Sequence, residues 1–204
     1  MVSDSETGRF AWKAATTVAV PISGRSEVGF GSFPRKDNAM SENTETAILA
    51  GGCYWITQEL MRHCEGVISI RAGWTGGESD NPTEDEPGGH AEAVKLVFDT
   101  DRASYRDVLE LFFQIHRPDL GEDVLGSLYR SEIFYTTDEQ RQVAEDTIAD
   151  VEAAGFWRPV ATRISEAGRF LEAEAEDQDY FERYPDSSQF PRPARAAASH
   201  ETAA

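Results

Sequence analysis

A cysteine occupies a position suited to chemistry in the stretch Ala50-Gly51-Gly52-Cys53-Tyr54-Trp55, where a short apolar run gives way to a helical pattern. Two glycines allow the backbone to turn sharply out of a strand. A cysteine at the first turn of the next helix faces unpaired N–H groups and the positive end of the helix dipole, which favours the thiolate. We therefore expect Cys53 to have a lowered thiol pKa and to act as a nucleophile, with Tyr54 and Trp55 as an apolar wall for a substrate. The spacing alone is also typical of a small buried residue at the end of a strand.

The length and composition of the chain limit the kinds of protein it can be. The chain has 204 residues, enough for one domain with a hydrophobic core and too few for two ordinary ones. It carries 37 Asp and Glu against 19 Lys and Arg, a net charge of −18, so we expect no binding to nucleic acid. Such a charge in a chain with 40% hydrophobic residues is typical of proteins that stay hydrated at high salt. Salt adaptation is therefore one hypothesis, and an ordinary acidic protein is the other.

The sequence shows no sign of membrane insertion. No uninterrupted apolar run approaches the roughly 18 residues of a membrane helix. The segment Thr16–Ile22 is too short for a signal sequence and is interrupted by Pro21. Two cysteines are too few for a disulfide framework. We expect a cytoplasmic protein with no membrane partner.

The chain divides into three parts. Residues 1–42 are rich in Ser, Gly, Pro and charge without sustained periodicity, and we expect a disordered N-terminal extension. Residues 187–204 mix prolines with a run of alanine, and we expect a mobile C-terminal tail. The remaining part, 43–186, is predicted to be the catalytic domain.

Strands and helices alternate within this domain. Strands are predicted near 46–50, 67–72, 92–98, 133–135 and 160–164. Helices are predicted to begin at Tyr54, after Ser104 with Asp107 three residues on, and after Thr137 with Gln140 three residues on. This order predicts a mixed architecture of sheet and helices.

Several short motifs occur in an order that resembles the A-type peptide methionine sulfoxide reductases, over roughly residues 46 to 185. They are Cys53-Tyr54-Trp55, Ala72-Gly73-Trp74-Thr75-Gly76-Gly77, Asn81-Pro82-Thr83, Gly89-His90-Ala91-Glu92-Ala93-Val94 and Tyr129-Arg130-Ser131-Glu132-Ile133-Phe134-Tyr135. The resemblance implies an α+β fold, a ferredoxin-like two-layer sandwich around a mixed sheet, with the catalytic cysteine at a strand-to-helix turn. It also implies reduction of the S epimer of methionine sulfoxide, free or in proteins, to methionine.

The resemblance assigns catalytic roles to three residues. Cys53 would attack the sulfoxide sulfur, which becomes electrophilic only when its oxygen is protonated or strongly hydrogen-bonded. Glu92 would be the acid, because a strand face shared with Val94 would desolvate its carboxyl group and keep it protonated. Tyr129 would donate a second hydrogen bond to the oxygen. Taken singly, Glu92 also fits a charge at a strand end, and Tyr129 fits a core aromatic.

Substrate contacts follow from the same resemblance. Tyr54 and Trp55 would pack around the substrate methyl group, and Asp123 would replace an aspartate of the family in an uncertain register. Glu84 stands where the family usually has a tyrosine, so we expect one hydrogen bond to the oxygen to be missing. Strand alternation places His90 on the face opposite Glu92, and we assign it a structural role.

Turnover would leave Cys53 as a sulfenic acid, which a second thiol must reduce. Cys64 lies eleven residues further on, roughly 16 Å away along a helix, whereas a disulfide needs Cα atoms within about 7 Å. We expect Cys64 to fill the buried face of that helix. We therefore predict an external reductant, a thioredoxin-like protein or a small thiol, with no bound cofactor or metal and a monomeric enzyme.

Two other functions remain compatible with the sequence. The lost tyrosine would fit a catalytically weak relative that binds methionine-containing segments. A thiol redox sensor, in which oxidised Cys53 signals to a partner, would need no sulfoxide pocket. Turnover that depends on the sulfoxide separates both from a reductase.

Overall fold

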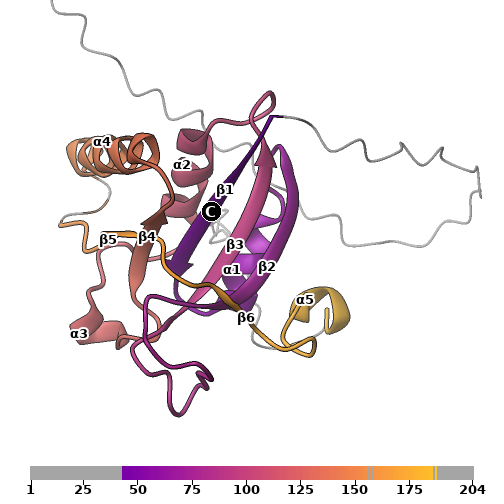
Figure 1. The fold of residues 1–204 in the computed structure, drawn as a ribbon. Coiled ribbons are helices and arrows are strands. Elements are labelled where there is room, and N and C mark those ends of the chain that lie inside the picture. Colours follow the sequence, from indigo (N-terminus) through magenta and orange to yellow (C-terminus); the bar gives the residue numbers. More distant parts are fainter. Residues whose placement is uncertain (1–42, 156, 158, 186, 188–204) are drawn as a thin grey trace, which may run out of the picture. The chain divides into compact units, whose positions relative to one another are not determined.

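The computed structural model describes residues 43–155, 157, 159–185 and 187 (Figure 1). The predictions for 1–42 and for the tail beyond Ser187 lie outside these residues. The described elements are, in order, β1 Thr44–Gly51, α1 Tyr54–Met61, β2 Val67–Thr75, β3 Ala91–Asp99, α2 Tyr105–Ile115, α3 Glu122–Leu125, β4 Ser131–Tyr135, α4 Asp138–Ala154, β5 Arg163–Glu166, β6 Leu171–Glu172 and α5 Tyr180–Arg183. Among the described residues no helix is long and apolar enough to cross a membrane.

The strands form a six-stranded sheet in the order β5-β4-β1-β3-β2-β6. Strand β5 runs parallel to β4, and every other neighbouring pair is antiparallel. The four central strands together with α1 and α2 have the β-α-β-β-α-β order of a ferredoxin-like unit. The predicted α+β fold around a mixed sheet is therefore confirmed.

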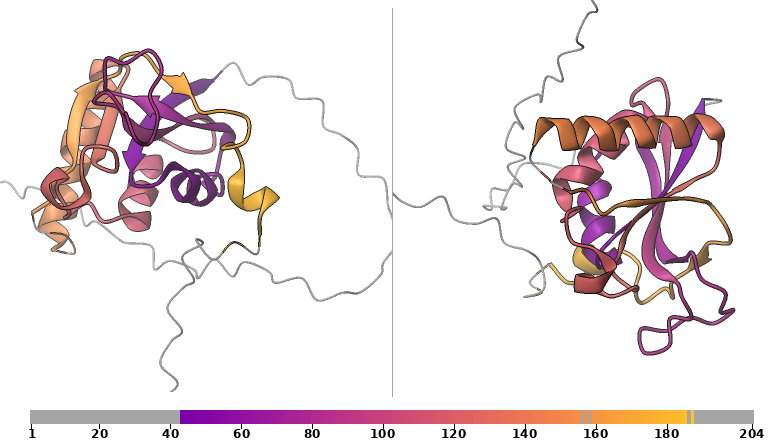
Figure 2. Two further views of the ribbon diagram at one scale, coloured as in Figure 1. Left: turned by 90° about the horizontal axis from the view of Figure 1, so that it is seen from below. Right: turned by 90° about the vertical axis from the view of Figure 1, so that its left-hand side faces the viewer.

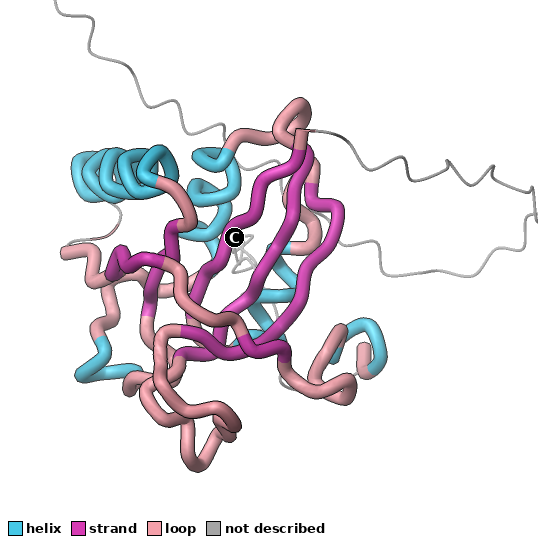
Figure 3. The backbone as a smooth tube through the Cα atoms, viewed as in Figure 1, coloured by secondary structure: helices cyan, strands magenta, loops and turns pink. Residues whose placement is uncertain are grey.

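The helices α1, α2 and α4 cover one face of the sheet (Figure 2). Strand β1 shows the alternation that this requires, because Ala47 and Leu49 point into the helical core while Ile48 and Ala50 point to the other face. The loop between β5 and β6, with Ala167 and Phe170, covers that second face (Figure 3). Both faces of β1 are thus buried from Ala47 to Ala50, which explains the apolar run of this strand.

Register brings three chain segments to one end of the sheet. The end of β1 pairs with the start of β4, with Gly51 opposite Ser131, and Leu49 of β1 pairs with Val94 near the start of β3. The residues just after β1, at the start of β3 and just before β4 therefore meet at the same end of the sheet. These positions hold Cys53, Glu92 and Tyr129.

The predicted helix starts are confirmed by their capping geometry. The Ser104 hydroxyl accepts from the Asp107 N–H at 3.2 Å, and Asp107 Oδ2 accepts from the Ser104 N–H at 2.9 Å, which completes a capping box. Thr137 caps α4 by accepting from the Gln140 N–H at 3.2 Å. Both starts were predictable because the interaction is local in sequence.

Replacing Ser104 by alanine should lower the free energy of unfolding by about 1 kcal/mol, because one N–H at the start of α2 then loses its acceptor. The measurement is the urea unfolding midpoint. Ser69→Ala is the matched control, because Ser69 is an exposed strand residue. Equal midpoints for the two variants would contradict the stabilising role of the cap.

Candidate active site

Cys53 lies at the predicted strand-to-helix turn, directly before α1. Gly52 has φ +97°, a conformation that glycine adopts without strain. At Gly51 a Cβ atom would lie 2.6 Å from the Phe112 ring, so only glycine allows this close approach to α2. The Cys53 carbonyl accepts from the N–H and the hydroxyl of Thr57 at 3.0 and 3.1 Å, which anchors the turn to the first turn of the helix.

The predicted lowering of the Cys53 pKa is wrong for the substrate-free protein. Burial of the thiol and the nearby charge of Glu92 raise its pKa to about 11. The N–H groups of Trp55 and Ile56 act in the expected direction, but they are outweighed. Cys53 is therefore a neutral thiol at neutral pH, and it lines the same cavity as Glu92.

Glu92 has the desolvated environment that its strand position predicts. Its side chain lies on the helical side of β3 and the residue is only 4% exposed. Burial raises the pKa of Glu92 to about 7, although the Tyr54 N–H, which donates to Glu92 Oε2 at 2.7 Å, acts against this rise. A substantial fraction of Glu92 therefore carries its proton at neutral pH.

Two phenols border the same space. Tyr129 is partly buried, and its hydroxyl donates to Glu84 Oε1 at 3.2 Å. Burial and the charge of Glu92 raise the pKa values of both Tyr129 and Tyr54. Both phenols therefore stay neutral and remain hydrogen-bond donors.

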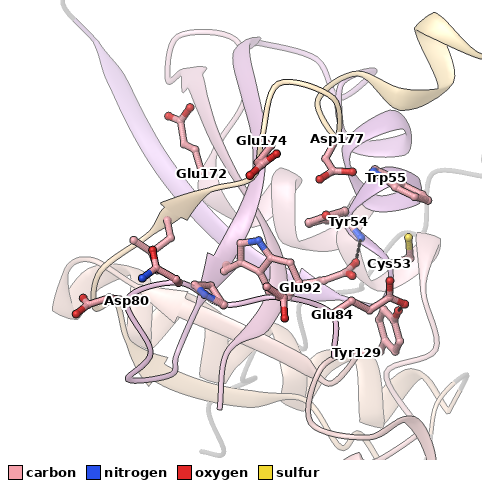
Figure 4. Close-up of a pocket in the computed structure, with 15 residues that line it drawn as sticks. Cys53, Tyr54, Trp55, Asp80, Glu84, Glu92, Tyr129, Glu172, Glu174 and Asp177 are labelled. Atoms are coloured by element: carbon pink, nitrogen blue, oxygen red, sulfur yellow. Dashed lines mark hydrogen bonds between the residues drawn. The ribbon is translucent and has the colours of Figure 1, made fainter. Parts of the chain in front are cut away.

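These groups open into one cavity of about 610 Å³ (Figure 4). Its residues come from the turn before α1 and the start of that helix, from the end of β2, the start of β3 and the loop between them, from the segment before β4, and from β6 and the segment after it. The lining comprises Cys53, Tyr54, Trp55, Trp74, Asp80, Asn81, Pro82, Thr83, Glu84, Glu92, Tyr129, Leu171, Glu172, Glu174 and Asp177. Five of the six predicted site residues line it.

Asp123 is the predicted site residue that the structure does not bring to this cavity. It is exposed in the short helix α3 and is not among the lining residues. Asp123 lies in the first turn of α3, which begins at Glu122, directly after Gly121. No substrate contact is therefore assigned to Asp123.

His90 and Cys64 are not among the residues that line the cavity. His90 is buried, accepts from the Gly77 N–H at 3.3 Å, and its Nε2 donates to the Ser79 carbonyl at 2.9 Å. It anchors the loop between β2 and β3, which is a structural role as predicted. The predicted reason was wrong, because residues two positions apart on a strand share a face and His90 precedes β3, which begins at Ala91. Cys64 is free, but α1 ends at Met61, so Cys64 lies in the following turn and not on a helical face as predicted; it still packs against the core.

Sequence reasoning missed the aromatic and acidic residues that the chain contributes around α5. The Tyr180 ring stacks on Trp55, with ring centroids 4.0 Å apart and an interplanar angle of 11°. Gln178 holds this segment in place, because its side chain accepts from the Ala72 N–H and donates to the Ala72 carbonyl, both at 2.9 Å. No periodicity in the sequence indicates these long-range contacts.

One cavity thus holds a thiol, a carboxyl group that retains its proton, and neutral phenols. This combination of a nucleophile, an acid and hydrogen-bond donors is typical of the active site of a thiol-dependent oxidoreductase. A family model described as peptide methionine sulfoxide reductase matches residues 45–202. The chain therefore belongs to the peptide methionine sulfoxide reductase family.

Individual relatives and solved structures support this family assignment. The peptide methionine sulfoxide reductase MsrA of Nocardia farcinica is 53% identical over 158 residues, which cover 74% of this chain and 92% of the relative. MsrA of Mycolicibacterium vanbaalenii is 54% identical over 154 residues, covering 72% and 90%. Among solved structures, methionine sulfoxide reductase A of Corynebacterium diphtheriae has a TM-score of 0.60 at 27% identity and covers 72% of this chain and 77% of that chain. Reduced Mxr1 of Saccharomyces cerevisiae, at 23% identity and covering 73% and 90%, has the same fold with a TM-score of 0.63.

Proposed function

We propose that this protein reduces the S epimer of methionine sulfoxide, in proteins or free, with Cys53 as the nucleophile and Glu92 as the acid. The observation that carries the proposal is that the Cys53 thiol and the buried Glu92 carboxyl group line the same cavity. Because the pKa of Glu92 is about 7 and that of Cys53 about 11, the proton needed by the sulfoxide oxygen and the thiol that attacks are both present at neutral pH.

The reaction balances with these groups alone. Glu92 passes its proton to the sulfoxide oxygen while the Cys53 sulfur attacks the sulfoxide sulfur, and the thiol proton passes to the Glu92 carboxylate. The attack forms a bond between the two sulfur atoms. This S–S bond and the S–O bond of the substrate then break as the protonated oxygen transfers to the Cys53 sulfur, which becomes a sulfenic acid. Two electrons have moved from the cysteine sulfur to the substrate sulfur, which leaves as the thioether of methionine.

Three aromatic or phenolic residues support this step. Tyr129 donates its hydroxyl to the sulfoxide oxygen as negative charge grows there. Trp55, stacked on Tyr180, and Tyr54, whose ring lies edge-on to Trp74 at 5.6 Å, supply apolar surface for the substrate methyl group. This assignment gives Tyr54 and Trp55 the binding role expected from the sequence.

An external thiol completes the cycle. Cys64 lies beyond the end of α1, packs against the core and is not among the residues that line the cavity, so it is poorly placed to attack the Cys53 sulfenic acid. A thioredoxin-like protein or a small thiol therefore attacks the Cys53 sulfenic acid directly. In line with this chemistry we propose that the protein works as a monomer in the cytoplasm.

The test is turnover of the two epimers of a methionine sulfoxide peptide with dithiothreitol, in dilute buffer and in molar salt. We expect reduction of the S epimer alone. A folded protein that reduces neither epimer in either salt concentration would be evidence for a methionine-binding module or a redox sensor. Higher activity and stability in molar salt would support the hypothesis of salt adaptation.

A further inference from the structure

Glu84 lines the cavity, but the reaction proposed above gives it no task. It lies on the loop between β2 and β3, at the side of the cavity where Tyr129 and Cys53 are found (Figure 4). The base of this loop is fixed, because buried His90 bonds to Gly77 and to Ser79. The loop therefore holds a carboxyl group at the reacting end of the cavity.

The first contact of Glu84 is with Tyr129. The Tyr129 hydroxyl donates to Glu84 Oε1 at 3.2 Å. A phenol has a single O–H to donate, so this bond fixes where that hydrogen points before substrate binds. When a sulfoxide enters, the hydroxyl can turn from Glu84 to the sulfoxide oxygen.

The second effect of Glu84 is on Glu92. Apart from burial, the charge of Glu84 is the largest cause that raises the pKa of Glu92, and Asp177, before α5, adds a smaller rise. The Tyr54 N–H at the start of α1 and the Cys53 thiol act in the opposite direction. No Lys, Arg or His is found among the described residues that line the cavity, so no cation there offsets the two carboxylates.

We propose that Glu84 is a positioning residue of this enzyme, which holds the Tyr129 side chain at the reacting end of the cavity by a hydrogen bond until the sulfoxide replaces it as the acceptor, and whose negative charge keeps the proton on Glu92. The proposal rests on the proposed function, because it matters for turnover only if Glu92 gives its proton to the sulfoxide oxygen. Glu84 itself neither gains nor loses a proton in the reaction.

Glu84→Gln isolates the effect of charge, because its amide oxygen can still accept from Tyr129. The decline of kcat/KM at alkaline pH, measured with an S-sulfoxide peptide, should move to lower pH by about half a unit or more. Asp85→Asn is the matched control, because Asp85 is exposed on the same loop and does not line the cavity. This control should leave the profile in place, and an equal movement in both variants would overturn the proposal.

Comparison of Glu84→Ala with Glu84→Gln isolates the effect of the hydrogen bond, because both variants lack the charge and only the alanine variant also lacks the acceptor. We expect its kcat/KM, measured at pH 6, to be about fivefold lower than that of Glu84→Gln. Rescue by glutamine distinguishes an orienting bond from charge alone. Equal values for the two variants would reject the orienting role.

Carbon-13 NMR titration of the Glu92 carboxyl group in the substrate-free protein tests the charge effect without turnover. Glu84→Gln should lower the midpoint of the Glu92 titration, and Asp85→Asn should not. An unchanged midpoint in Glu84→Gln would overturn the proposal even if the enzyme is active. A lowered midpoint in a protein that reduces neither epimer would reject the reductase assignment while supporting the action of Glu84 on Glu92.

Discussion

Replacement of Cys53 by serine is expected to abolish sulfoxide reduction, lowering kcat by at least about a thousandfold. A serine hydroxyl is a far weaker nucleophile than a thiol, and it cannot accept the substrate oxygen as a sulfenic acid. The variant should fold, because the Cys53 side chain makes no capping hydrogen bond and is only partly buried. Turnover of an S-sulfoxide peptide with dithiothreitol measures the loss, and the urea midpoint checks the fold.

Cys64→Ser is the control for this prediction, since Cys64 is the other cysteine of the chain. It should keep kcat within about twofold, with some loss of stability because Cys64 packs against the core. Mass spectrometry after one turnover without reductant should show one added oxygen atom on Cys53. Activity that survives in Cys53→Ser, or a Cys53 to Cys64 disulfide after turnover, would contradict the mechanism and the external reductant.

The features that the sequence predicted well are local ones. The capping pairs at Ser104 and Thr137 join residues three positions apart, so their geometry needs no knowledge of the rest of the chain. The apolar run of β1 and the alternation that places Glu92 on the same face of β3 as Val94 are likewise set by neighbouring residues. The element order was therefore predictable, except for three elements of four or fewer residues, α3, β6 and α5.

The features that the sequence did not reveal depend on contacts between distant residues. Tyr180 stacks on Trp55 because the Gln178 side chain bonds to the backbone of Ala72 and so fixes the segment before α5. Gln178 and Ala72 are 106 residues apart in the chain, so no local pattern indicates this contact. At Gly73 a Cβ atom would lie 2.3 Å from the Leu171 carbonyl, so this glycine allows β6 to approach β2. The aromatic wall of the cavity was therefore predicted only in part.

The error on the Cys53 pKa has a clear physical cause. The helix N-terminus does favour the thiolate, and its N–H groups act on Cys53 as predicted. Burial and Glu92 act more strongly, and both depend on packing that a sequence does not display. A neutral thiol beside a protonated acid nevertheless suits a reaction in which oxygen must be protonated before sulfur attacks.

Replacement of Glu92 by glutamine is expected to lower kcat/KM by about a hundredfold to ten-thousandfold, the usual contribution of a positioned acid. Wild-type activity should fall as pH rises through about 7, because the proton that the sulfoxide oxygen needs then leaves Glu92. The residual activity of Glu92→Gln should lack this decline. The pH profile of kcat/KM measures both effects, and a decline near pH 7 that persists in the variant would assign the acid to another group.

The same substitution should affect stability in the opposite sense. The Glu92 pKa is about 7 in the folded protein against an ordinary value of 4.5, so between these pH values the folded state binds more protons than the unfolded state. Wild-type stability therefore falls across this window, by about 3 kcal/mol from this group, and the loss is complete above pH 7. Glutamine has no proton to lose, and its amide oxygen can still accept from the Tyr54 N–H. We expect Glu92→Gln to gain about this amount over the wild type between pH 4.5 and 8, measured as the difference in urea unfolding free energies. A constant difference across this range would show that Glu92 is not held protonated by burial, and the acid of the proposed reaction would lose its physical basis.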